Sequence, residues 1–130
     1  MSRAFAPGEQ IGLRVTPDAY VTVRYAGASG DFNPIHIDEE FARQVGLPGR
    51  ILHGMWTMAQ VARSLTDAAG DPAALRSLSV QFRAAARIGE EITISGAVRQ
   101  LDGDLATVHA DVIQGGKRLI RGAVAEVRSG

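Results

Sequence analysis

The chain has 130 residues, and 14 Lys and Arg balance 14 Asp and Glu, so the formal net charge at pH 7 is zero. A hydrophobic content of 45% with 22% charged residues is typical of a globular protein, and the length predicts one domain over residues 1–130. The charge balance argues against nucleic acid as a partner. The absence of cysteine excludes a disulfide scaffold, a thiol nucleophile and a thiolate metal site.

The N-terminal segment carries no targeting signal. Its first ten residues, MSRAFAPGEQ, lack the apolar run of a signal peptide. No later stretch reaches the roughly 20 apolar residues that a membrane helix requires. We therefore expect a cytoplasmic protein that does not bind membranes.

The first predicted helix covers residues 16–28. A hydroxyl, a proline and an acid at Thr16, Pro17 and Asp18 are a favourable helix start. Apolar or small residues then recur at helical spacing, at Tyr20, Val23, Ala26 and Gly27. The β-branched residues at 21–23 leave a strand as the alternative.

Residues 31–36, DFNPIH, predict an irregular loop, because the Asn-Pro pair is a turn signal and the residue before proline avoids the helical region. Asp38 then predicts the cap of a short helix. Phe41, Ala42 and Val45 are expected to face inward, and Gly46 is expected to end the helix.

Residues 54–69 form the most helical pattern in the chain. Apolar residues recur at helical spacing, and the only charges are Arg63 and Asp67, so we expect a buried helix. The expected inward face consists of Met55, Met58, Ala59, Ala62 and Leu65. Gly70 closes this helix.

From residue 75 onward the apolar pattern has a period of two, which predicts four antiparallel strands. Turn signals at Asp102–Asp104 and Gly115-Gly116 separate the later strands, and the last strand runs from about Arg118 to Val127. The alternating apolar residues are Leu78, Val80, Phe82, Ile92, Ile94, Val98, Val108, Ala110 and Val112. One face of such a sheet must be buried, so we predict an α+β fold in which the sheet wraps around the helix at 54–69.

Asp31 and His36 are the first candidates for chemistry. A loop of this length can bring a carboxylate and an imidazole to one water molecule, with one group taking a proton while the other gives one. The alternative is structural: Asp31 caps a turn and His36 is half-buried. The spacing alone favours the structural interpretation.

His53 and Gly54 stand directly before the long helix. Glycine lets a ligand approach the backbone, and the unpaired amides of a helix start suit a developing oxyanion. The alternative is that Gly54 only permits close packing. His109 lies on the polar side of a strand and is expected at the surface. The spacing of His36, His53 and His109 matches no compact ligand set, so no metal site is expected.

The segment Tyr25 to Ala42, YAGASGDFNPIHIDEEFA, resembles the signature of the MaoC-like, or (R)-specific enoyl-CoA hydratase, family. The later Ile51 to Met55, ILHGM, is similar to the family's helix-entry motif, although Trp56 is bulkier than expected there. The matching signature residues are Tyr25, Ser29, Gly30, Asp31, Asn33, Pro34, Ile35, His36 and Ala42.

The resemblance implies a hotdog fold, in agreement with the sheet and helix pattern. It implies that Asp31 and His36 activate the water that adds to C3 of a trans-2-enoyl thioester, giving the (R)-3-hydroxyacyl thioester, or eliminate water in reverse. It also implies that the Gly54 amide contacts the thioester carbonyl. Asn33, Ser29 and His53 complete the expected substrate-binding and oxyanion site.

The resemblance further implies a dimer, most simply a homodimer, with a heterodimer of two related hotdog subunits as the alternative. The substrate would be an acyl-CoA or acyl-carrier-protein thioester of fatty acid metabolism, and no metal or redox cofactor is implied. A carrier protein would require a positive rim, for which Arg50, Arg83 and Arg87 are the candidates.

Three other functions compete with a hydratase or dehydratase. The first is a hotdog thioesterase, whose water attacks the carbonyl carbon instead of C3. The second is the catalytic subunit of a heterodimeric 3-hydroxyacyl-ACP dehydratase. The third, a non-catalytic acyl-binding module, predicts loss of Asp31 or His36, and both are present.

Overall fold

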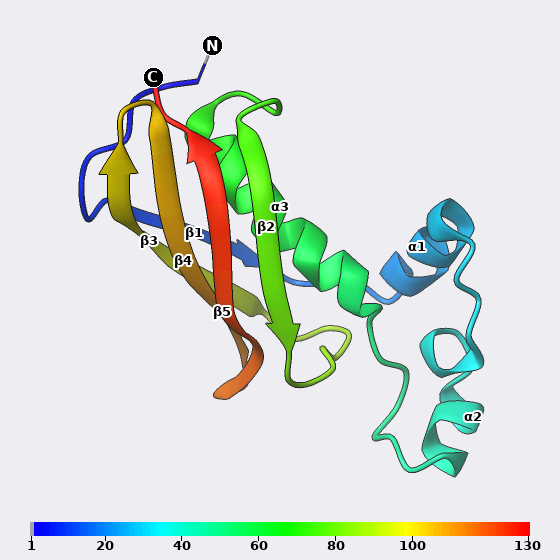
Figure 1. The fold of residues 1–130 in the computed structure, drawn as a ribbon. Coiled ribbons are helices and arrows are strands. Elements are labelled where there is room, and N and C mark those ends of the chain that lie inside the picture. The colour runs from blue at the N-terminus through cyan, green and yellow to red at the C-terminus, as the bar shows by residue number, and fades with distance from the viewer. Residues whose placement is uncertain (1) are drawn as a thin grey trace.

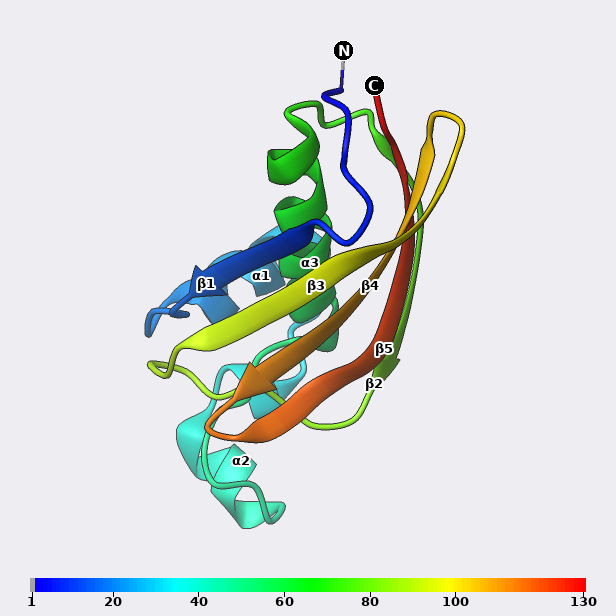
Figure 2. The same cartoon turned by 90° about the vertical axis from the view of Figure 1, so that its left-hand side faces the viewer.

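The computed structural model describes residues 2–130, in which five antiparallel strands form one sheet of order β1-β3-β4-β5-β2. The strands are β1 (Gln10–Val15), β2 (Leu75–Phe82), β3 (Ile92–Asp102), β4 (Leu105–Gln114) and β5 (Lys117–Arg128). The helices are α1 (Val21–Ser29), a 3-10 turn (Pro34–His36), α2 (Glu39–Gln44) and α3 (Gly54–Ala69). The sheet curves along α3 (Figures 1 and 2), which confirms the expected α+β hotdog fold.

The predicted alternation of the later strands is confirmed. In β3, Ile92 and Ile94 are buried, and in β4, Val108 and Val112 are buried, all within one core cluster. Strand β1 was not predicted. It pairs with β3 from Gln10↔Ala97 to Val15↔Ile92, and its signal was the short alternation of Ile11, Leu13 and Val15.

Helix α3 has the predicted bounds, and Gly70 ends it in the left-handed conformation with φ 69°. The predicted inward face is wrong apart from Leu65. The residues buried against the sheet are Thr57, Val61, Ser64, Leu65 and Ala69. Met55 is 57% exposed, and Met58, Ala59 and Ala62 are exposed or half-buried. Apart from Leu65, short side chains therefore occupy the face toward the sheet, whereas Met55 lies on the open face.

The segment between β1 and α3 projects beyond the N-terminal end of α3, away from the sheet (Figure 1). Helix α1 begins at Val21 and not at 16, and the strand alternative is wrong. The Asp18 carboxylate accepts a hydrogen bond from the Tyr20 amide at 2.7 Å, so it holds a turn before the helix. Tyr20 and Val23 are exposed, and Ala26 is buried.

Helix α2 has the predicted cap: an Asp38 carboxylate oxygen accepts the Phe41 amide at 3.1 Å. Gly46 follows with φ 94°, as expected for the residue that ends the helix. Of the three residues expected to face inward only Ala42 is buried, whereas Phe41 and Val45 are exposed. Two short helices without a sheet beneath them have little core to cover these side chains.

The two termini lie close together at one end of the sheet (Figure 2). The Arg3 amide donates to the Ala69 carbonyl at 2.9 Å, and the Gly130 amide donates to the Arg3 carbonyl at 3.0 Å. Among residues 2–130, none of the helices combines the length and the apolar character that crossing a membrane requires.

Candidate active site

The loop from Ser29 to His36 is held by successive side-chain contacts to its own backbone. The Ser29 hydroxyl oxygen accepts the Asp31 amide at 3.1 Å, and Asp31 Oδ1 accepts the Asn33 amide at 3.2 Å. Asn33 Oδ1 then accepts the Ile35 amide at 3.3 Å and caps the 3-10 turn. Such local bonds are the reason that Ser, Asp and Asn favour turns. The predicted irregular loop is therefore short and well defined, and it ends in one helical turn.

His36 is buried in a fixed tautomer. Its Nδ1 lies 2.8 Å from the Ile51 carbonyl oxygen. A carbonyl only accepts hydrogen bonds, so Nδ1 carries the proton and Nε2 of the neutral ring has a free lone pair. That lone pair makes Nε2 the position at which His36 can accept a proton.

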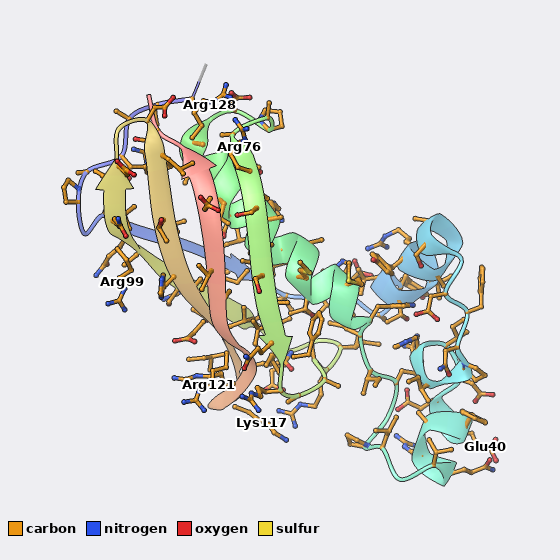
Figure 3. All side chains as sticks on the ribbon, viewed as in Figure 1. Glu40, Arg76, Arg99, Lys117, Arg121 and Arg128 are labelled. Carbon is orange, nitrogen blue, oxygen red and sulfur yellow. The ribbon has the colours of Figure 1, made fainter. Side chains whose placement is uncertain are left out.

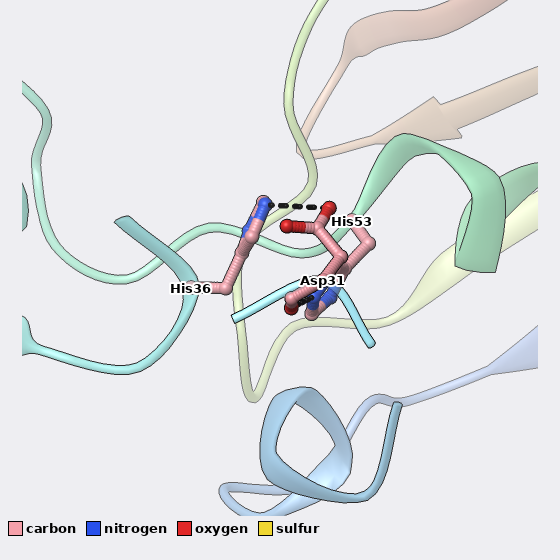
Figure 4. A group of neighbouring side chains, drawn as sticks. All are labelled: Asp31, His36 and His53. Atoms are coloured by element: carbon pink, nitrogen blue, oxygen red, sulfur yellow. Dashed lines mark hydrogen bonds and ion pairs between the residues drawn. The ribbon is translucent and has the colours of Figure 1, made fainter. Parts of the chain in front are cut away.

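Asp31 and His36 face one another (Figure 4): Asp31 Oδ2 lies 3.8 Å from His36 Nε2. The Asp31 side chain is 53% exposed and the His36 side chain 9% exposed, so the pair lies at the boundary between solvent and core. A water oxygen at ordinary hydrogen-bond distance from both atoms fits this separation. The structural alternative for Asp31 is also realised, because Oδ1 holds the turn while Oδ2 faces the imidazole.

His53 contacts both Asp31 and His36. Its Nε2 lies 3.0 Å from the Asp31 carbonyl oxygen, so Nε2 carries the proton and fastens the Asp31 backbone. Its ring stacks on that of His36, with centroids 3.8 Å apart and planes at 22°, and Tyr25 lies 4.7 Å from it on another side. His53 Nδ1 is buried and has no hydrogen-bond partner among residues 2–130.

Asp31, His36 and His53 place possible ligand atoms within 4.8 Å of one another, a spacing that a metal ion can use. The stacking of the two imidazoles argues against a shared ion. Ring lone pairs lie in the ring plane, and two stacked rings with centroids 3.8 Å apart and planes at 22° keep the two lone pairs from converging on one point.

Gly54 begins α3 beside this pair. The amides of a first helical turn have no partner within the helix and carry partial positive charge. A Cβ at position 54 would lie 3.2 Å from the Phe82 ring, so glycine allows the close contact between the helix start and the end of β2.

A cavity of about 250 Å³ lies next to this helix start. Its lining is mostly apolar and comes from the 3-10 turn, the loop before α3, α3 itself, the end of β2 with the loop that follows it, and β5. The lining residues are His36, Ile51, Leu52, Gly54, Thr57, Phe82, Arg83, Ala84, Ala85, Ala86, Leu119 and Ile120. His36 and Gly54 thus border a pocket of suitable character for an acyl thioester.

Sequence reasoning did not find Thr57 or Phe82. Thr57 is 3% exposed, but in the sequence it is a polar residue that interrupts an apolar helix pattern. Phe82 has no sequence signal for the site, because only the fold brings its ring next to Gly54. Trp56, on α3, lines a hollow together with Val21 and Tyr25 of α1. His109 is exposed on the sheet, as predicted, and takes no part in the site.

Comparison with known proteins identifies the family of the chain. A family model described as a MaoC like domain matches residues 6–110. The chain is 30% identical over 125 residues to the enoyl-CoA hydratase ChsH3 of Mycobacterium tuberculosis, covering 95% of this chain and 37% of that protein. The chain therefore spans well under half of that relative's length.

Two solved structures are also similar. A MaoC-like dehydratase superposes with a TM-score of 0.91 at 31% identity, over 99% of this chain and 43% of that one. An (R)-hydratase from A. caviae, described as involved in PHA biosynthesis, superposes with a TM-score of 0.89 at 23% identity, over 99% of this chain and 100% of that one. The second similarity shows the fold alone.

Proposed function

The chain belongs to the MaoC-like family, and on that premise we propose that it is a hydro-lyase that interconverts trans-2-enoyl thioesters and (R)-3-hydroxyacyl thioesters. The observation that carries the proposal is the pairing of Asp31 Oδ2 with His36 Nε2 at 3.8 Å beside the cavity. The relative named an enoyl-CoA hydratase supports the same reaction class.

The pair suits the addition of one water. Both Asp31 Oδ2 and the unprotonated His36 Nε2 are acceptors, so a water between them directs its two hydrogens at the pair and a lone pair away from it. Hydration joins the water oxygen to C3 and requires that the pair take one proton from water and return one to C2. Elimination reverses these steps. Only water and protons move, so the reaction requires no redox cofactor.

The helix start suits the thioester carbonyl. As C3 is attacked, negative charge develops on the carbonyl oxygen, and the Gly54 amide at the start of α3 would donate to it. The exposed Phe82 ring covers this position from the side of β2. In this proposal Ser29, Asn33 and His53 act by holding the Asp31 loop.

The test is turnover of crotonyl-CoA and longer enoyl-CoAs, measured as loss of the enoyl-thioester absorbance with chiral analysis of the product. Wild type should give the (R)-alcohol, and Asp31→Asn and His36→Ala should each lose at least about a hundredfold in kcat, within the range for general acid-base groups. A thioesterase would instead release free thiol from saturated acyl-CoA. Thiol release without hydration would reject the hydro-lyase.

We further infer that the chain pairs with a second hotdog subunit, most simply a copy of itself. Large apolar side chains are exposed around the site: Phe32 follows Asp31, Met55 follows Gly54, and Phe82 covers it. Contiguous exposed apolar surface is typical of protein interfaces. Sedimentation equilibrium should give a dimer, and Met55→Glu should shift it toward monomer. A monomeric wild-type chain would reject the homodimer and favour a different hotdog subunit as the partner.

A further inference from the structure

A cationic groove adjoins the proposed active site. It lies at the lower end of the sheet in Figure 3, where Arg121 and Lys117 are labelled, and it has a volume of about 430 Å³. We call it the arginine groove, and its lining residues are Arg83, Ile113, Gly116, Arg118 and Arg121. Arg83 also lines the cavity that contains His36 and Gly54, so the groove and the cavity share a wall.

Hydrogen bonds connect the segments that line the groove and the cavity. The Arg83 amide donates to the carbonyl of Leu119, a β5 residue that lines the cavity, at 2.8 Å. The buried Gln114 side chain accepts from the Arg87 amide at 2.7 Å and donates to the Arg87 and Glu90 carbonyls at 2.8 and 2.9 Å. The β2–β3 loop is thereby fastened to the β4–β5 hairpin, and the arginines keep a defined position relative to the site.

The charge around the groove is unbalanced, although the whole chain is neutral. Arg118 has a distant carboxylate partner, Asp111 at 3.8 Å, and Arg83 contacts the uncharged Gln81 at 3.0 Å. In the part of the chain that the structure describes, Arg121 and Lys117 form no ion pair. The neighbouring Arg87 pairs with Glu90 at 2.7 Å.

We propose that the arginine groove binds phosphate of the molecule that carries the thioester; this assignment rests on the hydro-lyase function proposed above. Guanidinium groups bind phosphate oxygens in pairs of hydrogen bonds. An acyl chain is apolar, so three arginines would not stabilise its binding. The part of the substrate that contacts the arginines would therefore be the charged carrier. Phosphate of this kind occurs in coenzyme A and in the phosphopantetheine arm of an acyl carrier protein.

The experiment compares Arg118→Gln/Arg121→Gln with a control that removes the same charge elsewhere, Arg76→Gln/Arg99→Gln. Both control arginines are exposed and lie away from the groove (Figure 3). The substrates are crotonyl-CoA, crotonyl-phosphopantetheine and crotonyl-pantetheine, which differ in their phosphates. We expect the groove variant to raise the KM for crotonyl-CoA about tenfold with kcat unchanged, as for two solvent-accessible charge contacts. Crotonyl-pantetheine and the control variant should show no change.

The substrates also separate the sources of phosphate. An equal rise for crotonyl-phosphopantetheine assigns the groove to the phosphate that both carriers share. A rise for crotonyl-CoA alone assigns it to the adenosine phosphates, and hence to coenzyme A. An unchanged KM for all three substrates in the groove variant would overturn the proposal.

Binding of free coenzyme A, measured by calorimetry, separates this proposal from that of the reaction. Weaker binding to the groove variant than to the control supports the groove even if wild type hydrates no thioester. Normal turnover with equal coenzyme A affinity in both variants rejects the groove and leaves the hydro-lyase intact. Because contacts between exposed charges are screened, the affinity of wild type should also fall with added salt.

Discussion

Replacing Gly54 by proline removes the backbone N–H of that residue but still allows α3 to begin there. Proline is favoured at the first helical position, where the amide has no partner within the helix. The preceding His53 has φ −64° and ψ 134°, the extended conformation that a residue before proline prefers. The substitution therefore tests whether the Gly54 amide stabilises the carbonyl oxygen in the transition state.

The matched control is Gly54→Ala, which adds a Cβ and keeps the amide hydrogen. This Cβ would lie 3.2 Å from the Phe82 ring, so both variants crowd the ring and only the proline lacks the donor. Loss of one oxyanion donor typically lowers kcat by about 10²–10³, or about 3–4 kcal/mol in the barrier. We expect that difference between the proline and alanine variants in crotonyl-CoA hydration.

Circular dichroism and thermal unfolding should show both variants folded, with melting temperatures close to one another. If alanine alone abolishes activity, the pair is repeated in a Phe82→Ala background, which removes the crowded ring. Equal hydration rates for the two Gly54 variants would refute the role of this amide. The carbonyl contact would then have to come from another donor near the cavity.

Three further predictions follow from the packing and the hydrogen bonds. His53→Gln keeps a hydrogen-bond donor near the position of Nε2, whereas His53→Phe keeps only the stacked ring. Without the donor to its backbone Asp31 is misplaced, so kcat should fall by about ten- to a hundredfold more in the phenylalanine variant. Leu65→Ala, at a position 1% exposed in the core, should lower the free energy of unfolding in urea by about 2–5 kcal/mol. The pKa of Asp18 is lowered mainly by the side-chain hydrogen bond from Arg24 and to a smaller extent by the hydrogen bond from the Tyr20 amide. The Asp18 carboxylate therefore stabilises the fold above the ordinary aspartate pKa, and this effect is lost as the pH falls through the lowered pKa. The stability difference between wild type and Asp18→Asn should therefore be present at pH 7 and shrink in acid; a constant difference would show that the ion pair is not its cause.

The strands and the long helix could be predicted because their patterns are local. Alternation located β3 and β4, and the glycine-bounded apolar run located α3 from Gly54 to Ala69. The orientation of α3 could not be predicted from hydrophobicity, because the closest approach to the sheet selects short side chains such as Thr57 and Ser64. Strand β1 was missed because only three alternating apolar residues mark it, and it gains its pairing from β3, far away in the sequence.

The Asp31 and His36 site could be predicted from its motif but not from its spacing. Five residues of separation allow many geometries, and a turn-capping aspartate would have the same sequence. In the structure Asp31 makes both contacts at once: Oδ1 accepts a hydrogen bond within the turn, and Oδ2 faces the imidazole of His36. Their roles in catalysis stay a prediction, which the variants above test.

The geometry of the site depends on contacts between three loops more than on any one element. The Ile51 amide donates to the Ile35 carbonyl at 3.1 Å, next to His36, and the Leu52 amide donates to the Ala86 carbonyl at 2.9 Å. Gln114 continues this connection from the β2–β3 loop to the hairpin. Each contact joins segments distant in sequence, so none has a local signature. Because the same connection positions His36 at one end and the arginine groove at the other, the distance between His36 and the groove is set by these hydrogen bonds.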